Sequence, residues 1–359
     1  MKLLGKLIAY PVLAVNILVS ALLIFSCYGS LPAPIGRLPF ASLSGLAFPM
    51  LFGLDILFLF MWLFTWKKGA IVSVITLLIC LSPIFRYFPI HPFKAGKVQQ
   101  PYITVMTYNT EGLGIDDNSD RTPGNPVLQF ILQQEADIVL LQEAPKDVMT
   151  KASKDAEIRK KYPYITIPDE ITSGCCLSKY KILSKEVIKF ENSSNSGLYL
   201  RVLAGKDTIA VYNCHLESNR LQEKEISEYY RFIEHPTDNS HYEGSKKLLK
   251  KLLQSTSLRA GQASMIAERA KADKSRYVIV CGDFNDTPLS YSHHQFNLFM
   301  TDAYAVSGNG AGHTYHEHRL YYRIDHIFCS RNITPLHTWV DRSQKDSDHY
   351  PVISRLRLE

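Results

Sequence analysis

A long stretch without charge near the N-terminus constrains this chain more than any other sequence feature. No charged residue occurs between Lys6 and Arg37, and residues 7–27 within this gap are rich in Leu, Ile, Val and Ala. A helix of about 20 apolar residues crosses the roughly 30 Å hydrocarbon core of a bilayer. The stretch is too long for the apolar core of a cleaved signal peptide. We therefore predict a membrane-spanning helix here.

Two further apolar segments follow, at residues 43–66 and 69–88. The first is interrupted only by Asp55, and the second contains Pro83 and is marginal in length. A carboxylate exposed to lipid is costly, so Asp55 should face neighbouring helices, as a polar contact between them. We predict about three transmembrane helices within residues 1–90.

The basic excess of the chain belongs to this apolar part. The whole chain carries 40 Lys and Arg against 34 Asp and Glu, a net charge of +6. Residues 1–100 contain eight of the basic residues and one of the acids, so they carry +7 and residues 101–359 carry −1. Nucleic-acid-binding domains usually present a basic surface. The charge therefore says more about membrane topology than about a polyanionic substrate.

The positive-inside rule orients the predicted helices. Lys2 and Lys6 precede the first segment and the pair at 67–68 lies between the second and third, whereas only Arg37 separates the first from the second. Lys and Arg accumulate on the cytoplasmic side. Three crossings predict an integral, multi-pass membrane protein with an extracytoplasmic C-terminal part. The prediction reverses if the third segment does not cross.

Residues 101–359, after a linker at 91–100, have the size of one large globular domain. Short β-branched, aromatic or apolar segments alternate with helical patterns, which predicts an α/β or α+β sandwich. The predicted strands include residues 102–108, 137–142, 208–214, 277–281, 324–329 and 352–358. Five cysteines lie in this part, an odd number without disulfide spacing. We expect them to be free thiols.

Polar residues recur at the ends of the predicted strands. One such segment alone is more often a turn or a helix cap than a site. Their order and their shared placement at strand ends make the set informative. The segments are Thr107-Tyr108-Asn109, Leu141-Gln142-Glu143, Tyr212-Asn213-Cys214-His215, Gly282-Asp283-Phe284-Asn285, Arg323-Ile324-Asp325-His326 and Ser347-Asp348-His349.

Taken in order, these segments resemble the motifs of the endonuclease/exonuclease/phosphatase superfamily, which includes deoxyribonucleases and neutral sphingomyelinases. The resemblance covers about residues 102–358. The matching stretches are MTYNTEGL, DIVLLQEA, GCCLSKYKIL, VYNCHLES, VIVCGDFNDTP, YRIDHIFCS and SDHYPV. It implies an α/β fold, a four-layered α/β/β/α sandwich of two packed sheets, and Mg²⁺-dependent cleavage of phosphate esters, in which Mn²⁺ can substitute.

The resemblance also implies a metal region. Glu143 corresponds to the carboxylate that holds the metal, and Asn109 and Asp348 complete its surroundings. Hard cations such as Mg²⁺ take oxygen ligands and keep several waters, so one or two carboxylates suffice.

The same resemblance implies catalytic roles. Asp283 corresponds to the residue that orients the attacking water, and Asn285 to one that hydrogen-bonds the phosphoryl oxygens. His349 corresponds to the catalytic imidazole, whose tautomer Asp325 fixes. His215 corresponds to a second histidine that contacts phosphate or assists the leaving group. The division of acid and base roles between the histidines stays open.

Chemistry supports this set, because phosphodiester hydrolysis needs charge neutralisation, a positioned water and a proton donor. Beside the motif residues, Tyr108, Asn213 and Arg323 are candidate substrate-binding residues.

Residues 220–257 look like a helical insertion into the family's pattern. Within it, residues 246–253 alternate pairs of Lys and Leu, which is typical of a basic amphipathic helix. Such a helix either packs its Leu face on the domain or lies on an anionic bilayer.

We therefore predict a membrane-anchored, Mg²⁺-dependent phosphoesterase with the bilayer as a partner. Its substrate would be a lipid headgroup or a phosphorylated solute near the membrane. A nuclease acting on DNA or RNA is the less favoured alternative, and a non-catalytic membrane-anchored binding module is an alternative of another class. The sequence does not indicate an oligomeric state.

Overall fold

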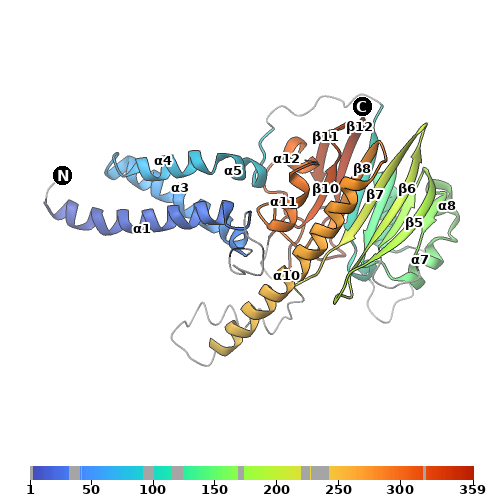
Figure 1. The fold of residues 1–359 in the computed structure, drawn as a ribbon, viewed down its shortest axis with the longest axis horizontal. Helices are drawn as coiled ribbons and strands as arrows, with labels where there is room; N and C mark the ends of the chain where they lie inside the picture. The colour runs from blue at the N-terminus through green and yellow to red at the C-terminus, as the bar shows by residue number, and fades with distance from the viewer. Residues whose placement is uncertain are drawn as a thin grey trace.

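The structure is a computed structural model that describes residues 3–31, 41, 43–91, 101–114, 124–168, 174–219, 227, 242–317 and 321–359. Most of the predicted linker, at 92–100, and most of the predicted insertion before residue 242 lie outside the described residues. A set of apolar helices lies end-on against a β-rich domain (Figure 1).

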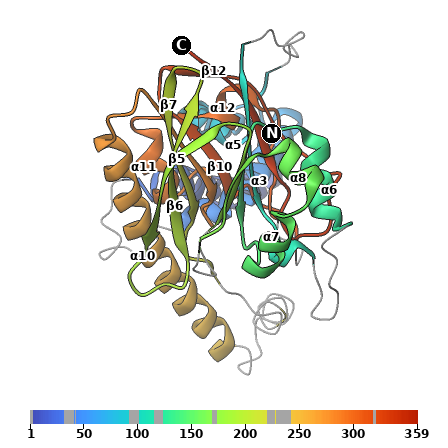
Figure 2. The same cartoon turned by 90° about the vertical axis from the view of Figure 1, so that its right-hand side faces the viewer.

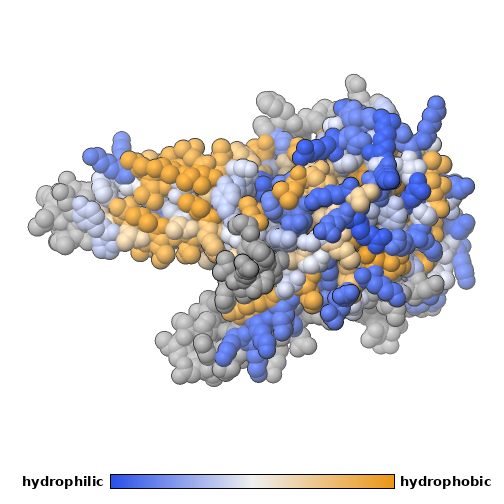
Figure 3. Space-filling view, viewed as in Figure 1, coloured by the Kyte–Doolittle hydropathy of each residue, from blue (hydrophilic) through white to orange (hydrophobic). Residues whose placement is uncertain are grey.

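The N-terminal helices are apolar on their outer surface. They are α1 (Leu3–Tyr28), the 3₁₀ turn η1 (Ser44–Ala47), α3 (Phe48–Thr65), α4 (Ala70–Ile79) and α5 (Leu81–Tyr87). Hydrophobic side chains cover the face of this part seen in Figure 3, whereas the same face of the β-rich domain is largely hydrophilic. Apolar surface on this scale is not usual for a protein in water.

The prediction of about three transmembrane helices is confirmed only in part. Among the described residues, two helical stretches are long and apolar enough to cross a membrane, Ala9–Tyr28 and Ser44–Thr65. The third segment is the pair α4 and α5, which meet at a 67° bend. Pro83 has no N–H to donate to the carbonyl of Ile79, four residues earlier, and the hydroxyl of Tyr28 donates to that carbonyl instead, at 2.7 Å. Proline thus accounts for the break.

Asp55 faces the other helices, as predicted, and is fully buried. Its Oδ1 accepts hydrogen bonds from Ser20 Oγ of α1 at 2.8 Å and from Ser73 Oγ of α4 at 3.2 Å. Asn16 of α1 donates to the same atom at 3.4 Å and accepts from Trp62 Nε1 at 3.0 Å. This polar network joins α1, α3 and α4 within their apolar surroundings.

The β-rich domain contains two six-stranded mixed sheets. The first has the order β11-β12-β1-β2-β4-β3 and the second the order β5-β6-β7-β8-β10-β9. The pairs β1–β2 and β7–β8 are parallel, and the other neighbours are antiparallel. The strands are β1 (Ile103–Asn109), β2 (Ile138–Gln142), β3 (Tyr164–Thr166), β4 (Cys175–Ser178), β5 (Lys181–Lys189), β6 (Ser196–Ala204), β7 (Asp207–His215), β8 (Tyr277–Asp283), β9 (Thr301–Asp302), β10 (Asp325–Cys329), β11 (Ile333–Val340) and β12 (Val352–Leu358).

The two sheets pack face to face, which confirms that part of the predicted fold. Val105 and Leu140 of the first sheet share a buried cluster with Leu200, Val211 and Ile279 of the second. All five strands that carry these residues are apolar on the inner face, so one core forms between the sheets.

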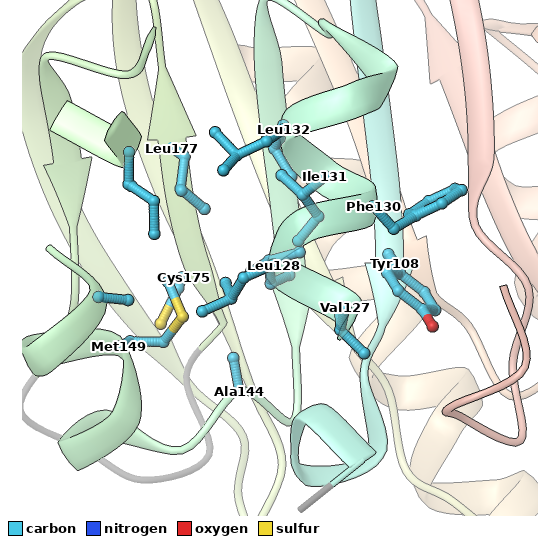
Figure 4. Packing of buried hydrophobic residues seen from close by; sticks show 14 of the residues in the cluster. Tyr108, Val127, Leu128, Phe130, Ile131, Leu132, Ala144, Met149, Cys175 and Leu177 are labelled. Atoms are coloured by element: carbon cyan, nitrogen blue, oxygen red, sulfur yellow. The ribbon is translucent and has the colours of Figure 1, made fainter. Parts of the chain in front are cut away.

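Helices cover the outer face of each sheet (Figure 2). Asn125 caps α6 by accepting the Leu128 N–H at 3.0 Å, and Pro126 opens the helix. The apolar face of α6 then packs on the first sheet, where Tyr108 lies beside Phe130 (Figure 4). The domain's helices are η2 (Glu111–Gly114), α6 (Pro126–Gln134), α7 (Lys146–Ala152), α8 (Ala156–Lys161), α10 (Tyr242–Ala272), α11 (Tyr291–Asn297) and α12 (Ala303–Ser307).

Arg323 joins the domain to the apolar helices. Its guanidinium is buried and donates to the carbonyls of Arg86 (2.7 Å) and Tyr87 (3.1 Å), which end α5, and to that of Ala311 (2.6 Å). It also lies over the ring of Tyr304, 4.4 Å from the centroid. Three carbonyls, all buried or partly buried, thus depend on this one side chain.

We expect Arg323→Met to destabilise the full-length protein in detergent by about 3–5 kcal/mol, because it leaves those carbonyls unpaired. Thermal unfolding measures the loss. Arg331→Met is the matched control, since Arg331 is exposed and donates to one carbonyl only, that of Leu298. Equal losses for the two variants would show that Arg323 does not hold this junction.

Candidate active site

Strand pairing brings the polar strand ends to one edge of the sandwich. β1 and β2 are parallel, so Asn109 at the end of β1 lies near Glu143, which follows β2. β7 and β8 are also parallel, and His215 and Asp283 at their ends are register partners. Asp325 opens β10 directly opposite Asp283. Five predicted site residues from five strands therefore converge.

Asp283 lies at the centre of this group and is almost fully buried. Its Oδ2 accepts from the side-chain amides of Asn109 and Asn285, both at 3.1 Å, and its Oδ1 accepts the backbone N–H of Asn285 at 2.8 Å. Burial raises the pKa of Asp283 although two histidines oppose the shift. The amides fix the direction in which this carboxylate points.

His349 is held by Asp325. A carboxylate can only accept, so His349 Nδ1 donates to Asp325 Oδ2, at 2.8 Å. The other ring nitrogen, Nε2, lies 3.8 Å from Asp283 Oδ2. Burial disfavours the imidazolium, but Asp325 and Asp283 outweigh this and raise the pKa of His349 to about 10. The ring is therefore fixed in orientation and favours its protonated form.

His215 faces the same carboxylates from β7. Its Nε2 lies 3.5 Å from Glu143 Oε1 and 3.7 Å from Asp283 Oδ2. This nitrogen is buried and has no hydrogen-bond partner within the described part of the chain. Buried polar atoms normally have partners, so an orphaned one at a site indicates a missing ligand or water.

Glu111 belongs to the site and was not among the predicted residues. Its Oε2 accepts the backbone N–H of Asp348 at 2.8 Å, and its own N–H donates to Asn109 Oδ1 at 3.2 Å. Burial raises the pKa of Asp348 to about 7, and Glu111, Glu143 and Asp283 add repulsion. The sequence could have indicated Glu111, because this residue lies two positions after Asn109 in the matching stretch MTYNTEGL.

Three site residues adopt a backbone conformation that side chains disfavour. Glu111, Glu143 and Asn285 have φ values of 42°, 52° and 51°. Left-handed backbone in residues other than glycine carries strain and is concentrated at functional sites. Here it coincides with the loops that follow three strands.

These side chains fit a divalent cation. Glu143 and Asp348 keep 43% and 22% of their side chains exposed, so solvent and ions reach them. The amide nitrogen of Asn109 donates to Glu143 at 3.1 Å, and the carboxylate of Glu111 accepts the Asp348 N–H at 2.8 Å. Carboxylates that repel one another are what a hard cation such as Mg²⁺ stabilises.

The three predicted substrate-binding residues are packed within the protein. Tyr108 lies in the cluster under α6, because adjacent side chains of a strand point to opposite faces (Figure 4). Asn213 bridges the sheets, donating to the Leu141 carbonyl and accepting from Gln142. Arg323 holds the end of α5, as described above. All three are buried by protein contacts.

A second histidine–carboxylate group lies behind the site. His293 Nε2 donates to Asp302 Oδ2 at 2.9 Å, and His326 Nε2 donates to the carbonyl of Asp286 at 2.9 Å. Burial lowers the pKa of both histidines, to about 3 for His326. The neutral His326 thus supports the loop that begins with Asn285.

A family model assigns the domain. The Endonuclease/Exonuclease/phosphatase family matches residues 106–349, about two thirds of the chain, and the chain belongs to this family. The apolar residues 6–87 match a separate family, described as a domain of unknown function, DUF8431. No curated protein sequence matches the chain.

Solved structures share the fold. D. rerio TDP2 complexed with a single-strand DNA product is 18% identical, with a TM-score of 0.52, 72% of this chain and 100% of that chain covered. An endonuclease/exonuclease/phosphatase from Bacteroides vulgatus is 18% identical, with a TM-score of 0.51 and coverage of 72% and 100%. The human Nocturnin catalytic domain with bound sulfate is 17% identical, with a TM-score of 0.50 and coverage of 73% and 96%. At these identities the likeness concerns the fold.

Proposed function

We propose that this chain is a membrane-anchored, metal-dependent phosphoesterase. The observation that carries the proposal is the convergence on Asp283 of two amides and two histidines, one of them fixed by Asp325. Family membership supports phosphoester hydrolysis as the class of reaction. The contacts support a role for each residue in that reaction.

The chain's own residues position water and protons. Asp283, held by Asn109 and Asn285, orients a water for attack on phosphorus. His349 holds a proton at Nε2, since Asp325 occupies Nδ1, and so stabilises negative charge that develops on the phosphoryl group. His215 places its unpartnered Nε2 at the same spot, where it binds phosphate or assists the leaving group.

Glu143, Asn109 and Asp348 would hold a Mg²⁺ ion, which Mn²⁺ can replace, and Glu111 extends this oxygen-rich set. Such an ion, when bound, neutralises charge on the non-bridging oxygens. When one carboxylate is replaced, the remaining ligands still bind the ion, but with lower affinity. The effect of each such variant should therefore depend on metal concentration.

The proposed division of the chain is a membrane-spanning part within residues 1–90 and a catalytic domain at 101–359. The domain lies at the end of the helices opposite the N-terminus and the α3–α4 junction (Figure 1). That junction carries Lys67 and Lys68, and Lys2 and Lys6 precede or begin α1. The positive-inside rule then supports a multi-pass protein with an extracytoplasmic catalytic domain.

Cysteine labelling tests this topology, because all seven natural cysteines are buried. Lys206→Cys adds an exposed thiol in the turn between β6 and β7. We expect a membrane-impermeant maleimide to label this variant in intact cells and to leave the wild-type protein unlabelled. Labelling only after lysis would place the domain in the cytoplasm.

The proposed substrate is a lipid headgroup or a phosphorylated solute near the membrane. A nuclease is the second candidate, since the D. rerio TDP2 structure was solved with a DNA product. The net charge of −1 on residues 101–359 argues against it, because nucleases bind the phosphate backbone with basic residues. The test compares phospholipid and sphingolipid vesicles with single- and double-stranded DNA. Salt-sensitive DNA cleavage with inert lipids would reject the lipid assignment.

A further inference from the structure

The N-terminal half of α10 extends beyond the domain that the rest of this helix covers. From Ser255 onward the helix contributes buried residues, among them Thr256, Arg259 and Ala260. The preceding residues of α10 form a projection from the sandwich in both views (Figures 1 and 2). A helix rises 1.5 Å per residue, so residues 242–254 extend about 20 Å.

The projecting half has two chemically distinct faces. One side of the helix carries four leucines. They are Leu248 and the residues one, four and five positions after it, Leu249, Leu252 and Leu253. The exposed Lys247 and Lys250 lie on the other side, and the exposed Lys246 lies at the border of the two faces. Leu249 keeps 37% of its surface exposed, although Leu248 is buried. A helix with these faces suits the boundary between anionic headgroups and acyl chains.

We propose that this half of α10 binds the surface of an anionic phospholipid bilayer. The inference rests on the proposed membrane anchoring, because the bilayer must lie around α1 and α3. The N-terminal end of α10 points to the same side of the domain as these helices and reaches the level of their domain-facing ends (Figures 1 and 3). The positive charges of the three exposed lysines on this half of α10 are complementary to an anionic lipid surface.

The apolar helices and the catalytic loop meet close to this level. The loop after Asp283 inserts Leu289 into the cluster that Leu23, Phe48 and Tyr87 form, and Ser30 donates to the Leu289 carbonyl. Leu289 follows Asn285 by four residues, which span at most about 14 Å. The site therefore lies near the end of the apolar helices.

The domain half of α10 is tied to the same edge. Arg259 donates to the Glu217 carbonyl at 2.6 Å and lies 3.4 Å from Asp286, and Gln262 accepts the Glu217 N–H at 2.7 Å. Glu217 follows His215 by two residues. A bilayer contact at the projecting half therefore fixes the orientation of the site toward headgroups.

The test uses full-length protein reconstituted in vesicles of phosphatidylcholine, or of equal parts phosphatidylcholine and phosphatidylglycerol. A fluorophore on Leu249→Cys reports contact with lipid-attached quenchers, and a fluorophore on Lys206→Cys is the control. We expect at least about threefold more quenching at position 249 than at 206 in the anionic vesicles, reversed by high salt. We expect Lys246→Gln/Lys247→Gln/Lys250→Gln to abolish this difference.

Equal quenching at the two positions in anionic vesicles would overturn the inference, and so would quenching at 249 that is the same with and without phosphatidylglycerol. Neither result depends on hydrolysis. Quenching without any phosphoesterase activity would leave the bilayer contact standing and reject the proposed function. Hydrolysis without quenching would do the reverse.

Discussion

Replacing His349 with Ala should lower the rate of phosphoester hydrolysis by roughly a thousandfold, the usual scale for a lost proton-transfer group. The hydrogen bond from Nδ1 to Asp325 fixes the ring, and Nε2 faces Asp283. Loss of the imidazole removes both the proton and the positive charge that neighbouring carboxylates maintain. Steady-state rates of the full-length protein in detergent, at saturating Mg²⁺, measure the effect.

Asp325→Asn tests how Asp325 acts on the His349 ring without changing the size of the side chain. An amide keeps the shape of the side chain but no longer stabilises the imidazolium, so we expect a smaller loss than for His349→Ala. The two substitutions should not be additive, because both act through one ring. His337→Ala is the control histidine, half-buried on the edge strand β11 and stacked on Trp339. A His349→Ala enzyme as active as the His337→Ala enzyme would remove His349 from the mechanism.

Glu143→Gln should reduce activity at limiting Mg²⁺ by at least about a hundredfold, and higher Mg²⁺ should restore part of the loss. Glu143 combines an exposed carboxylate with contacts to Asn109 and His215 inside the site. The substitution removes a negative charge while keeping the size of the side chain. Activity measured over a range of Mg²⁺ concentrations distinguishes weaker metal binding from a lower maximal rate.

Glu135→Gln is the matched control for this variant. Glu135 also has a positive φ and pairs with Lys161 on the surface, and it lies at the opposite end of β2 from Glu143. Surface ion pairs contribute little, so we expect an unchanged metal requirement. A Glu143→Gln enzyme with the same Mg²⁺ dependence as wild type would contradict the assignment of Glu143 to the metal.

The sequence predicted the core strands well, because their patterns are strong. β1, β2, β7, β8, β10 and β12 correspond to the apolar or β-branched segments that the sequence indicated. β11 was not predicted as a strand. It contains Pro335, and a proline argues against a strand. In the structure, β11 is an edge strand whose register shifts between Pro335 and His337, which is where a proline is tolerated.

Prediction of the site had a physical limit. Motif order singled out residues at strand ends, and parallel pairing of β1 with β2 and of β7 with β8 brings those ends together. The sequence did not indicate that Tyr108 lies on the opposite face of β1 from Asn109, in the cluster under α6. Nor did it indicate the partners of Arg323 at the end of α5, which are more than 200 residues away in the chain. Contacts of that length leave no local pattern.

The sequence indicated an irregularity between α4 and α5 but not the size of the bend. Pro83 marked the third apolar segment as irregular, but the size of the bend depends on packing against α1 and on the Tyr28 hydroxyl at the Ile79 carbonyl. The polar network around Asp55 of α3 shows the same dependence, since the donors to Asp55 come from two other helices, α1 and α4.

The most direct measurement is hydrolysis of a panel of phosphodiesters and phosphomonoesters, lipid headgroups included, by the full-length protein with Mg²⁺ and with a chelator. Our account predicts hydrolysis of at least one substrate, its loss on chelation, its return with Mg²⁺ or Mn²⁺, and a roughly thousandfold lower rate in His349→Ala. Hydrolysis that persists in the chelator, or that proceeds at the wild-type rate in His349→Ala, would contradict the proposed site. No hydrolysis by a folded wild-type protein would instead favour a non-catalytic binding module.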